Sequence, residues 1–220
     1  MLGSLLTLAF WVLPVASALM VVATLSPTDE PTDPRPYGGA LLLWLLVAIP
    51  SLLERPFPVI YDVLRRDATY IASGQVWRLF TSPLVQMGGI SGTRNNLFAL
   101  AVVATAAVAY WGVTRTWVVF WFGGVASNIA VLGLRPVGGG NSMAHLVLAT
   151  ALVSSVLVDS RRRPLAVVFA VVVLAFAVVM VITRNYHAVS CAIGLAVGLI
   201  PWLRRPALAS EKAYLVEQRR

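Results

Sequence analysis

Ser142 and His187 are the residues of this sequence that could carry out nucleophilic chemistry. Ser142 follows the run GGGN at 138–141 and begins an apolar segment that extends to Val158. A serine on the first turn of a helix can act as a nucleophile when a second element brings a base to it. A serine there is also a common helix cap, so the role of Ser142 depends on whether a base lies beside it.

The last apolar segment begins at His187 and carries a stripe of small residues. Ser190, Gly194 and Gly198 follow the histidine at spacings of three, four and four residues. Residues at these spacings share one helix face, and small side chains let a second helix approach closely. If that second helix begins at Ser142, the imidazole of His187 can reach the serine hydroxyl. Alternatively, His187 is an exposed interfacial residue and the glycines only pack.

His145 is the alternative base for Ser142. It lies three residues after the serine on the same segment, so its ring can approach the hydroxyl only laterally. A histidine on a separate helix can face the serine directly, and we therefore favour His187. His145 could instead pack against the His187 ring.

The composition predicts an integral membrane protein with an all-α fold. Of 220 residues, 59% are hydrophobic and only 12% are charged, and the mean hydropathy is +0.82. A helix needs about 20 apolar residues to cross a bilayer. The expected spans are 4–25, 95–112, 116–133, 142–158, 164–182 and 186–203, with 39–53 as a thin span or an embedded hairpin piece. This predicts six or seven helices: the acidic loop around 29–33 favours six, and the apolar content of 39–53 favours seven.

Clusters of arginine predict the orientation of these helices. Arg161–Arg163 and Arg204–Arg205 should face the cytoplasm, so that the C-terminus is cytoplasmic. The loops at 54–93, 138–140 and 184–186 would then share the outer side. The net charge of +8 is explained by such topology signals, and no nucleic-acid partner is expected. The expected organisation is an N-terminal helix and acidic loop (1–38), a membrane core (39–203) and a basic tail (204–220).

Several motifs of this chain resemble those of the rhomboid family of intramembrane serine proteases. The segment GQVWRLFTS at 74–82 is similar to a motif of the first external loop of the family. Gly140 and Ser142 match the start of its G-x-S-G motif, and His187 with Gly194 matches its last-helix motif. The order of loops and spans also agrees with a six-helix rhomboid core.

This resemblance implies a function and a location. Ser142 would be the nucleophile and His187 the general base of a dyad, without cofactor or metal. The substrates would be transmembrane proteins, cleaved near the outer face of the bilayer. The chain would be a multi-pass protein of a bacterial cell membrane, and Trp77 and Arg78 would anchor the external loop at the headgroup level.

The sequence departs from the family at positions that bear on catalysis. Met143 follows the nucleophile where the family has glycine, and Ser190 replaces a second glycine. The histidine and asparagine that help to hold the oxyanion are not intact, which leaves Gln86, Asn95, Asn96 and the Gly140 loop as the candidates for positioning it. The alternative is therefore a catalytically inactive relative that binds membrane helices. A small transporter has less support, because the five clear spans after residue 94 carry no carboxylate.

Overall fold

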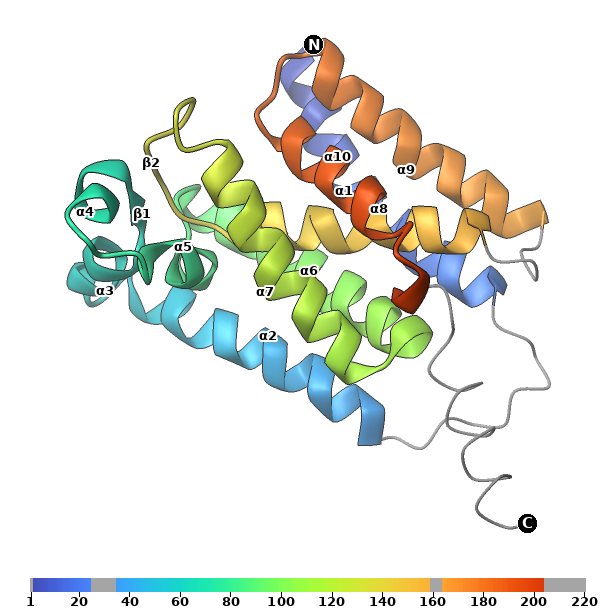
Figure 1. Cartoon of the computed structure of the whole chain (residues 1–220), viewed down its shortest axis with the longest axis horizontal. Helices are drawn as coiled ribbons and strands as arrows, with labels where there is room; N and C mark the ends of the chain where they lie inside the picture. Colours follow the sequence, from blue (N-terminus) through green and yellow to red (C-terminus); the bar gives the residue numbers. More distant parts are fainter. Residues whose placement is uncertain (1, 25–34, 159–163, 204–220) are drawn as a thin grey trace.

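The computed structural model describes residues 2–24, 35–158 and 164–203, and the side chains from Trp11 and Tyr37 onward in the first two of these ranges. Within them the chain is almost entirely helical (Figure 1). The helices are α1 (Leu2–Thr24), α2 (Arg35–Leu53), α3 (Pro58–Leu64), α4 (Ala68–Ala72), α5 (Arg78–Thr81), α6 (Gly89–Trp111), α7 (Val113–Ala130), α8 (Ser142–Val158), α9 (Pro164–Ile182) and α10 (His187–Val197). Two short strands, β1 (Arg66–Asp67) and β2 (Val137–Gly138), pair antiparallel, and 3₁₀ turns lie at Ser82–Leu84 and Pro201–Leu203.

The predicted all-α class is correct, but the predicted six-helix membrane bundle is wrong. Among the described residues, α9 is the one helix that is both long enough and apolar enough to cross a bilayer. A multi-pass integral membrane protein is therefore not supported, and the predicted location in a cell membrane with six or seven crossings falls with it. The structure is instead a bundle of helices of very unequal length.

Helix length and polar content explain why α6, α7, α8 and α10 do not qualify. Helix α10 has 11 residues and ends at Val197, so at 1.5 Å per residue it spans only about 16 Å, half of a hydrocarbon core. Helix α8 is longer but has 17 residues. Helices α6 and α7 have sufficient length, but they carry Arg94, Arg115 and Asn128 together with other polar residues. Average hydropathy along the sequence did not reveal these limits.

The segments used to predict orientation lie outside the described residues. They are the acidic loop around 29–33, Arg161–Arg163 and the basic tail from Arg204 onward. The expected cytoplasmic C-terminus therefore has no structural test. The segment 39–53 is neither a hairpin nor a separate thin piece, because it forms the main part of the single helix α2, which contains Pro50.

Helix α8 is the centre of the bundle. Every residue from Met143 to Val156 is buried, because α10, α7, α6, α9 and α1 all pack around it. A helix that is apolar on all sides is stable only when it is enclosed in this way. The first turn of α8, which carries Ser142, is therefore held in place by neighbours on every side.

Close approach between α8 and α10 depends on two glycines of the predicted small-residue stripe. A Cβ atom at Gly194 would collide with Thr150 and with the backbone of Val147. A Cβ atom at Gly198 would lie 2.8 Å from Cβ of Ser154 and would also collide with the carbonyl of Ala151. Helix α10 can therefore lie directly against α8, and this contact brings the start of α10 to the start of α8.

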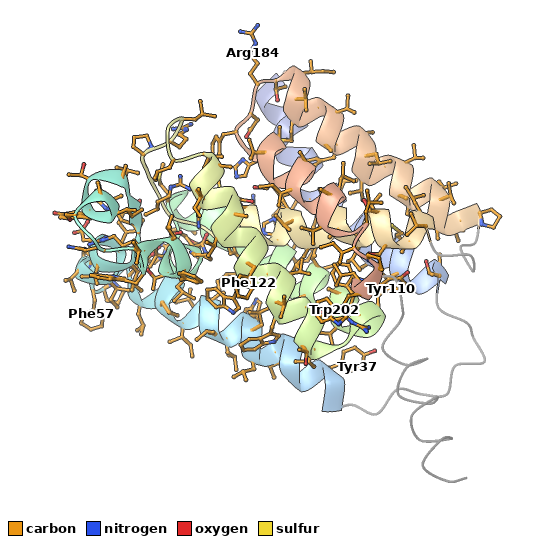
Figure 2. All side chains as sticks on the ribbon, in the orientation of Figure 1. Tyr37, Phe57, Tyr110, Phe122, Arg184 and Trp202 are labelled. Carbon is orange, nitrogen blue, oxygen red and sulfur yellow. The ribbon has the colours of Figure 1, made fainter. Side chains whose placement is uncertain are left out.

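The bundle exposes large apolar side chains along α2 and α9. Apolar surface of this extent is typical of a face that contacts a partner or lipid. The exposed residues are Leu41, Leu42, Leu45, Leu46, Ile49, Leu52 and Leu53 on α2, and Leu165, Val168, Val171, Val172, Val178, Val179, Val181 and Ile182 on α9. Phe57, Phe122 and Trp202, labelled in Figure 2, add exposed aromatic rings elsewhere on the surface.

The region 54–93, which the sequence indicated to be a long loop, is largely folded. It contains α3, α4, α5, β1, a 3₁₀ turn and the first residues of α6. Strand β1 pairs with β2, so that Arg66 lies opposite Gly138 and Asp67 lies opposite Val137. This region therefore holds the glycine loop that precedes Ser142.

Candidate active site

The structure brings Ser142 and His187 together at the starts of α8 and α10. Oγ of Ser142 lies 2.9 Å from Nε2 of His187. Both residues begin their helices, and the glycine contacts between α8 and α10 place these beginnings side by side. This is the distance that a serine hydroxyl and its general base require.

Asn185 orients the histidine and was not recognised from the sequence. Its Oδ1 atom lies 2.8 Å from Nδ1 of His187 and accepts a hydrogen bond of 3.0 Å from the backbone N–H of the same residue. The backbone donor identifies this atom of Asn185 as the oxygen, so Nδ1 of His187 must carry the proton. Nε2 is then unprotonated and faces the hydroxyl of Ser142, as a general base must.

The turn between α9 and α10 fixes Asn185. Arg184 has a φ of 52°, an unusual value for a residue with a side chain, and its backbone reverses the chain there. The backbone N–H of Asn185 donates to the carbonyl of Met180 at 2.9 Å. The signal in the sequence was an Asn two residues before a helix-starting His, because such side chains often accept from a nearby backbone N–H.

Each glycine of the 138–140 run has its own structural reason. Gly140 has a φ of 142°, which favours glycine, and its N–H donates to the carbonyl of Ser82 at 2.9 Å. A Cβ atom at Gly138 would lie 2.9 Å from the guanidinium of Arg66. A Cβ atom at Gly139 would lie 3.1 Å from the side chain of Val85. Glycine at 140 thus fits the backbone conformation, while side chains at 138 and 139 would have to displace Arg66 and Val85.

Arg78 fixes the region that supports this loop. It is buried, and it donates to Oε1 of Gln75 at 2.8 Å and to the carbonyls of Asp62 and Arg65 at 2.7 and 3.0 Å. Its guanidinium also lies 4.5 Å from the ring centre of Tyr70. These contacts fit a structural role for Arg78, whereas Trp77 next to it is exposed.

Two amide side chains lie close to Gly140 of the glycine loop. Nδ2 of Asn96 donates to Oε1 of Gln86 at 2.8 Å. These two atoms and Oγ of Ser142 all lie within 3.6 Å of the point where a Cβ atom of Gly140 would stand. Nε2 of Gln86 in turn donates to Ser51 at 3.0 Å, and its backbone N–H donates to the carboxylate of Glu54.

Of the two adjacent asparagines, Asn96 is the one whose amide lies beside Ser142. The side-chain oxygen of Asn95 is buried without a hydrogen-bond partner among the described residues. Gln86, Asn96 and Gly140 therefore belong to the same site, whereas the candidate Asn95 makes no described contact there. Both N–H groups of an amide can donate, so the bond to Gln86 leaves Asn96 one further donor.

Burial keeps the imidazole of His187 neutral. Its side chain is 7% exposed, and desolvation lowers its pKa to about 4, with further lowering by the positive charges of Arg135 and Arg66. His145 is 1% exposed, and burial followed by the charge of His187 lowers its pKa to about 3. Neither ring nitrogen of His145 has a hydrogen-bond partner among the described residues. His145 is therefore close to the pair without taking part in its hydrogen bonds.

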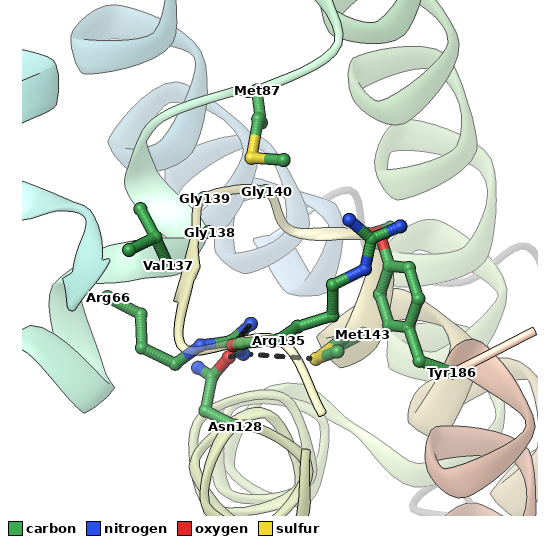
Figure 3. A pocket seen from close by; sticks show the side chains of 11 residues that line it. Arg66, Met87, Asn128, Arg135, Val137, Gly138, Gly139, Gly140, Met143 and Tyr186 are labelled. Carbon is green, nitrogen blue, oxygen red and sulfur yellow. Dashed lines mark hydrogen bonds between the residues drawn. The ribbon is translucent and has the colours of Figure 1, made fainter. Parts of the chain in front are cut away.

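A cavity opens beside Ser142 on the side of β2. Its volume is about 40 Å³, enough for a few water molecules. The lining residues, shown in Figure 3, are Arg66, Met87, Asn128, Arg135, Val137, Gly138, Gly139, Gly140, Ser142, Met143 and Tyr186. Met143 is buried and turns its sulfur toward Arg66, whose Nη1 lies 3.7 Å away. The bulky residue after Ser142 therefore forms part of the cavity wall.

The described residues contain no cluster of three His, Cys, Asp or Glu side chains suited to bind a metal ion. Cys191 is buried, and burial raises the pKa of its thiol to about 12, so it is a poor nucleophile.

No protein-family model, curated protein or solved structure matches the chain. The site must therefore be interpreted from its own geometry.

Proposed function

We propose that this protein is a serine endopeptidase with rhomboid-like active-site motifs, and that Ser142 and His187 form its catalytic dyad. The observation that carries the proposal is the continuous chain of hydrogen bonds from Ser142 through His187 to Asn185. A capping serine needs no such partner, because it would bond to the backbone N–H groups of its own helix. A nucleophile needs a base that is itself oriented by a third group.

The reaction follows from the tautomer of His187. Oγ of Ser142 attacks the peptide carbonyl carbon while its proton passes to Nε2, and the resulting imidazolium then donates that proton to the leaving amine. A water molecule, deprotonated by the same nitrogen, next attacks the acyl-enzyme ester and releases the acid and the free serine. Asn185 keeps the proton on Nδ1 throughout, so Nε2 alone exchanges protons with the substrate.

Two kinds of donor are available to the oxyanion of the tetrahedral intermediate. The first backbone N–H groups of α8 have no partner within the helix, and Asn96 has one amide hydrogen beyond its bond to Gln86. Removing one such donor typically costs about 10²–10³ in rate. Asn96 takes the role for which the family uses other residues, and a slow enzyme is the expected result.

The proposed substrates are apolar helical segments of membrane proteins, which are locally unwound at the site of cleavage. Support comes from the exposed apolar residues of α2 and α9, because such surfaces bind apolar partners or lipid. A peptide bond within a helix is shielded by its neighbours, so unwinding must precede attack by Ser142. Lipid is the second proposed partner of these two helices.

Covalent labelling tests the nucleophile directly. The purified protein is treated with a fluorophosphonate or an isocoumarin, and the modified residue is identified by mass spectrometry. We expect labelling at Ser142 that is lost in Ser142→Ala and in His187→Ala. Ser127→Ala is the matched control and should label normally, because Ser127 is a buried serine of α7 whose hydroxyl has no partner among the described residues.

Turnover is tested on a panel of transmembrane segments in detergent and in liposomes. Wild-type protein should release fragments that Ser142→Ala does not. The alternative function, an inactive protein that binds apolar helices, is supported by Met143, which occupies space beside the nucleophile. This alternative would replace the protease if neither wild type nor Ser142→Ala released fragments and neither reagent modified Ser142.

A further inference from the structure

Arg66 is a buried cation whose described partners are all uncharged. Its side chain is 3% exposed, Nη1 donates to Oδ1 of Asn128 at 2.6 Å, and Nη2 donates to the carbonyl of Arg135 at 2.9 Å. Its Nε is buried without a hydrogen-bond partner among the described residues. A buried charge is costly unless an opposite charge compensates it. Among the described residues the guanidinium therefore lacks a counterion, at a place where one would be strongly bound.

A second cation lines the same cavity. Arg135 enters from the segment between α7 and β2, and its guanidinium lies 4.9 Å from the ring centre of Tyr186 (Figure 3). No carboxylate is among the residues that line the cavity. The acid that follows Arg66 in the sequence, Asp67, accepts from the N–H of Thr69 and lies 3.8 Å from Arg65. It is therefore engaged away from Arg66.

Burial lowers the pKa of Arg66, and the positive charge of Arg135 lowers it further. A guanidinium nevertheless stays protonated in proteins, so the cavity keeps its positive charge. Its wall also includes Gly138–Gly140, Ser142 and Met143. A group bound there would lie directly beside the nucleophile.

We propose that this cavity is a specificity subsite for an acidic side chain of the substrate, an Asp or a Glu next to the scissile peptide bond. A carboxylate there would supply the counterion that Arg66 lacks and would displace the few water molecules that the cavity can hold. Gly138 leaves the space for the guanidinium, since a Cβ atom there would touch it. The inference deepens the proposed protease function and rests on it for the direction of the bound chain.

The first test measures binding separately from turnover. Ser142→Ala retains the cavity but has no nucleophile, so fluorescence anisotropy can follow two labelled apolar peptides that differ only in a central Asp or Asn. We expect the Asp peptide to bind about tenfold more tightly, as a charge-assisted hydrogen bond to a buried guanidinium should provide. Equal affinity for the two peptides overturns the subsite, whatever the protein does as an enzyme.

Arginine variants locate the effect. Arg66→Gln should reduce the preference to less than twofold, and Arg135→Gln should weaken it by a smaller factor. Arg115→Gln is the control: this arginine lies near the start of α7, about 20 Å along the helix from Asn128, and its guanidinium packs on Trp202. If Arg66→Gln does not fold, the Asp and Asn peptides compared on Ser142→Ala and on Arg135→Gln still decide the question.

Turnover then separates the two proposals. On a substrate that the wild type cleaves, Asp is placed in turn at each of the two positions on either side of the scissile bond and compared with Asn. A preference of about tenfold in kcat/KM at one position supports both proposals. Preferential binding without turnover supports an anion site and contradicts the protease, whereas turnover without preference for Asp contradicts the subsite alone.

Discussion

The first turn of α10 and the second turn of α8 each present a buried histidine near Ser142, and the two differ in every hydrogen bond. His187, on α10, bonds to Ser142 through Nε2 and to Asn185 through Nδ1. His145, on α8, has no partner for either ring nitrogen among the described residues. Burial lowers the pKa of both. Burial and a lowered pKa therefore do not identify a catalytic base, whereas a fixed tautomer that faces a nucleophile does.

The difference follows from which helix carries the ring. His145 shares α8 with Ser142, and its own backbone N–H continues the helix by donating to the carbonyl of Asn141 at 2.9 Å. At a spacing of three residues on the same helix, its ring can approach the serine hydroxyl only laterally. His187 belongs to a neighbouring helix that Gly194 and Gly198 bring close. Two helices in contact can oppose their side chains across an interface, as a proton transfer requires.

Replacing each of the two histidines separately should produce the largest difference in kcat. His187→Ala removes the base and should lower kcat by about 10³-fold or more, which is the range expected for general-base catalysis. His145→Leu should keep kcat within about threefold and leave the melting temperature unchanged or higher, because it removes unsatisfied polar atoms from the core. Hydrolysis of a transmembrane substrate and differential scanning fluorimetry measure both quantities. Comparable loss of activity in the two variants would contradict our assignment of the base.

Removal of the orienting acceptor should have the next largest effect. Asn185→Ala leaves Nδ1 of His187 without this acceptor, so the tautomer is no longer fixed, and kcat should fall about 10- to 100-fold, as for other groups that orient a functional histidine. Asn185→Asp keeps an acceptor at the same place and should retain most of the activity. If the alanine variant matched wild type in kcat, Asn185 would only complete the turn before α10.

Replacement of Met143 should raise kcat, whereas the preceding changes at His187 and Asn185 should lower it. If its side chain crowds the oxyanion beside Ser142, Met143→Gly should raise kcat several-fold. The oxyanion could then take its best position relative to its hydrogen-bond donors, on which its electrostatic stabilisation depends. Met143→Leu, which keeps the bulk, is the control and should resemble wild type. Glycine near a helix start also costs about 1 kcal/mol of stability, so rates must be compared well below the melting temperature. An unchanged or lower rate in the glycine variant, with the fold intact, would remove crowding as an explanation.

Several helices could be predicted from the sequence because they are uninterrupted apolar segments bounded by glycine, proline or charge. The predicted segments 142–158 and 164–182 coincide with α8 and α9. What these helices contact could not be predicted. Helix α8 is apolar because protein surrounds it, and an apolar segment in a protein core has the same composition as one in lipid.

The site was only partly predictable for a similar reason. Ser142, His187, Gly140 and the glycine stripe lie at spacings that local geometry can interpret. The buried Arg66 acts through contacts between distant segments, because it bonds to Asn128, 62 positions away. Asn185 is only two positions from His187, but its role depends on the pairing of that histidine with Ser142 on another helix. The folded region 54–93 was indicated to be a loop because helices of four to seven residues, such as α3 and α5, leave little periodicity in the sequence.

The smallest predicted effect concerns the pH dependence of His187. Its folded-state pKa, about 4, lies below the ordinary value of about 6.5, so the neutral base persists on acidification and the acid limb of kcat/KM should lie below pH 5. Because this pKa is lowered in the folded state, the contribution of His187 to the free energy of unfolding is fully present above about pH 6.5. It is lost as the pH falls toward 4, because the unfolded chain binds the proton first. Arg135 contributes part of the depression as a like charge. Arg135→Gln should therefore move the acid limb upward by a few tenths of a pH unit, whereas Arg115→Gln should not move it. A shift to lower pH, or equal profiles for the two variants, would show that the charge of Arg135 does not act on the base, and desolvation alone would then account for the neutral imidazole.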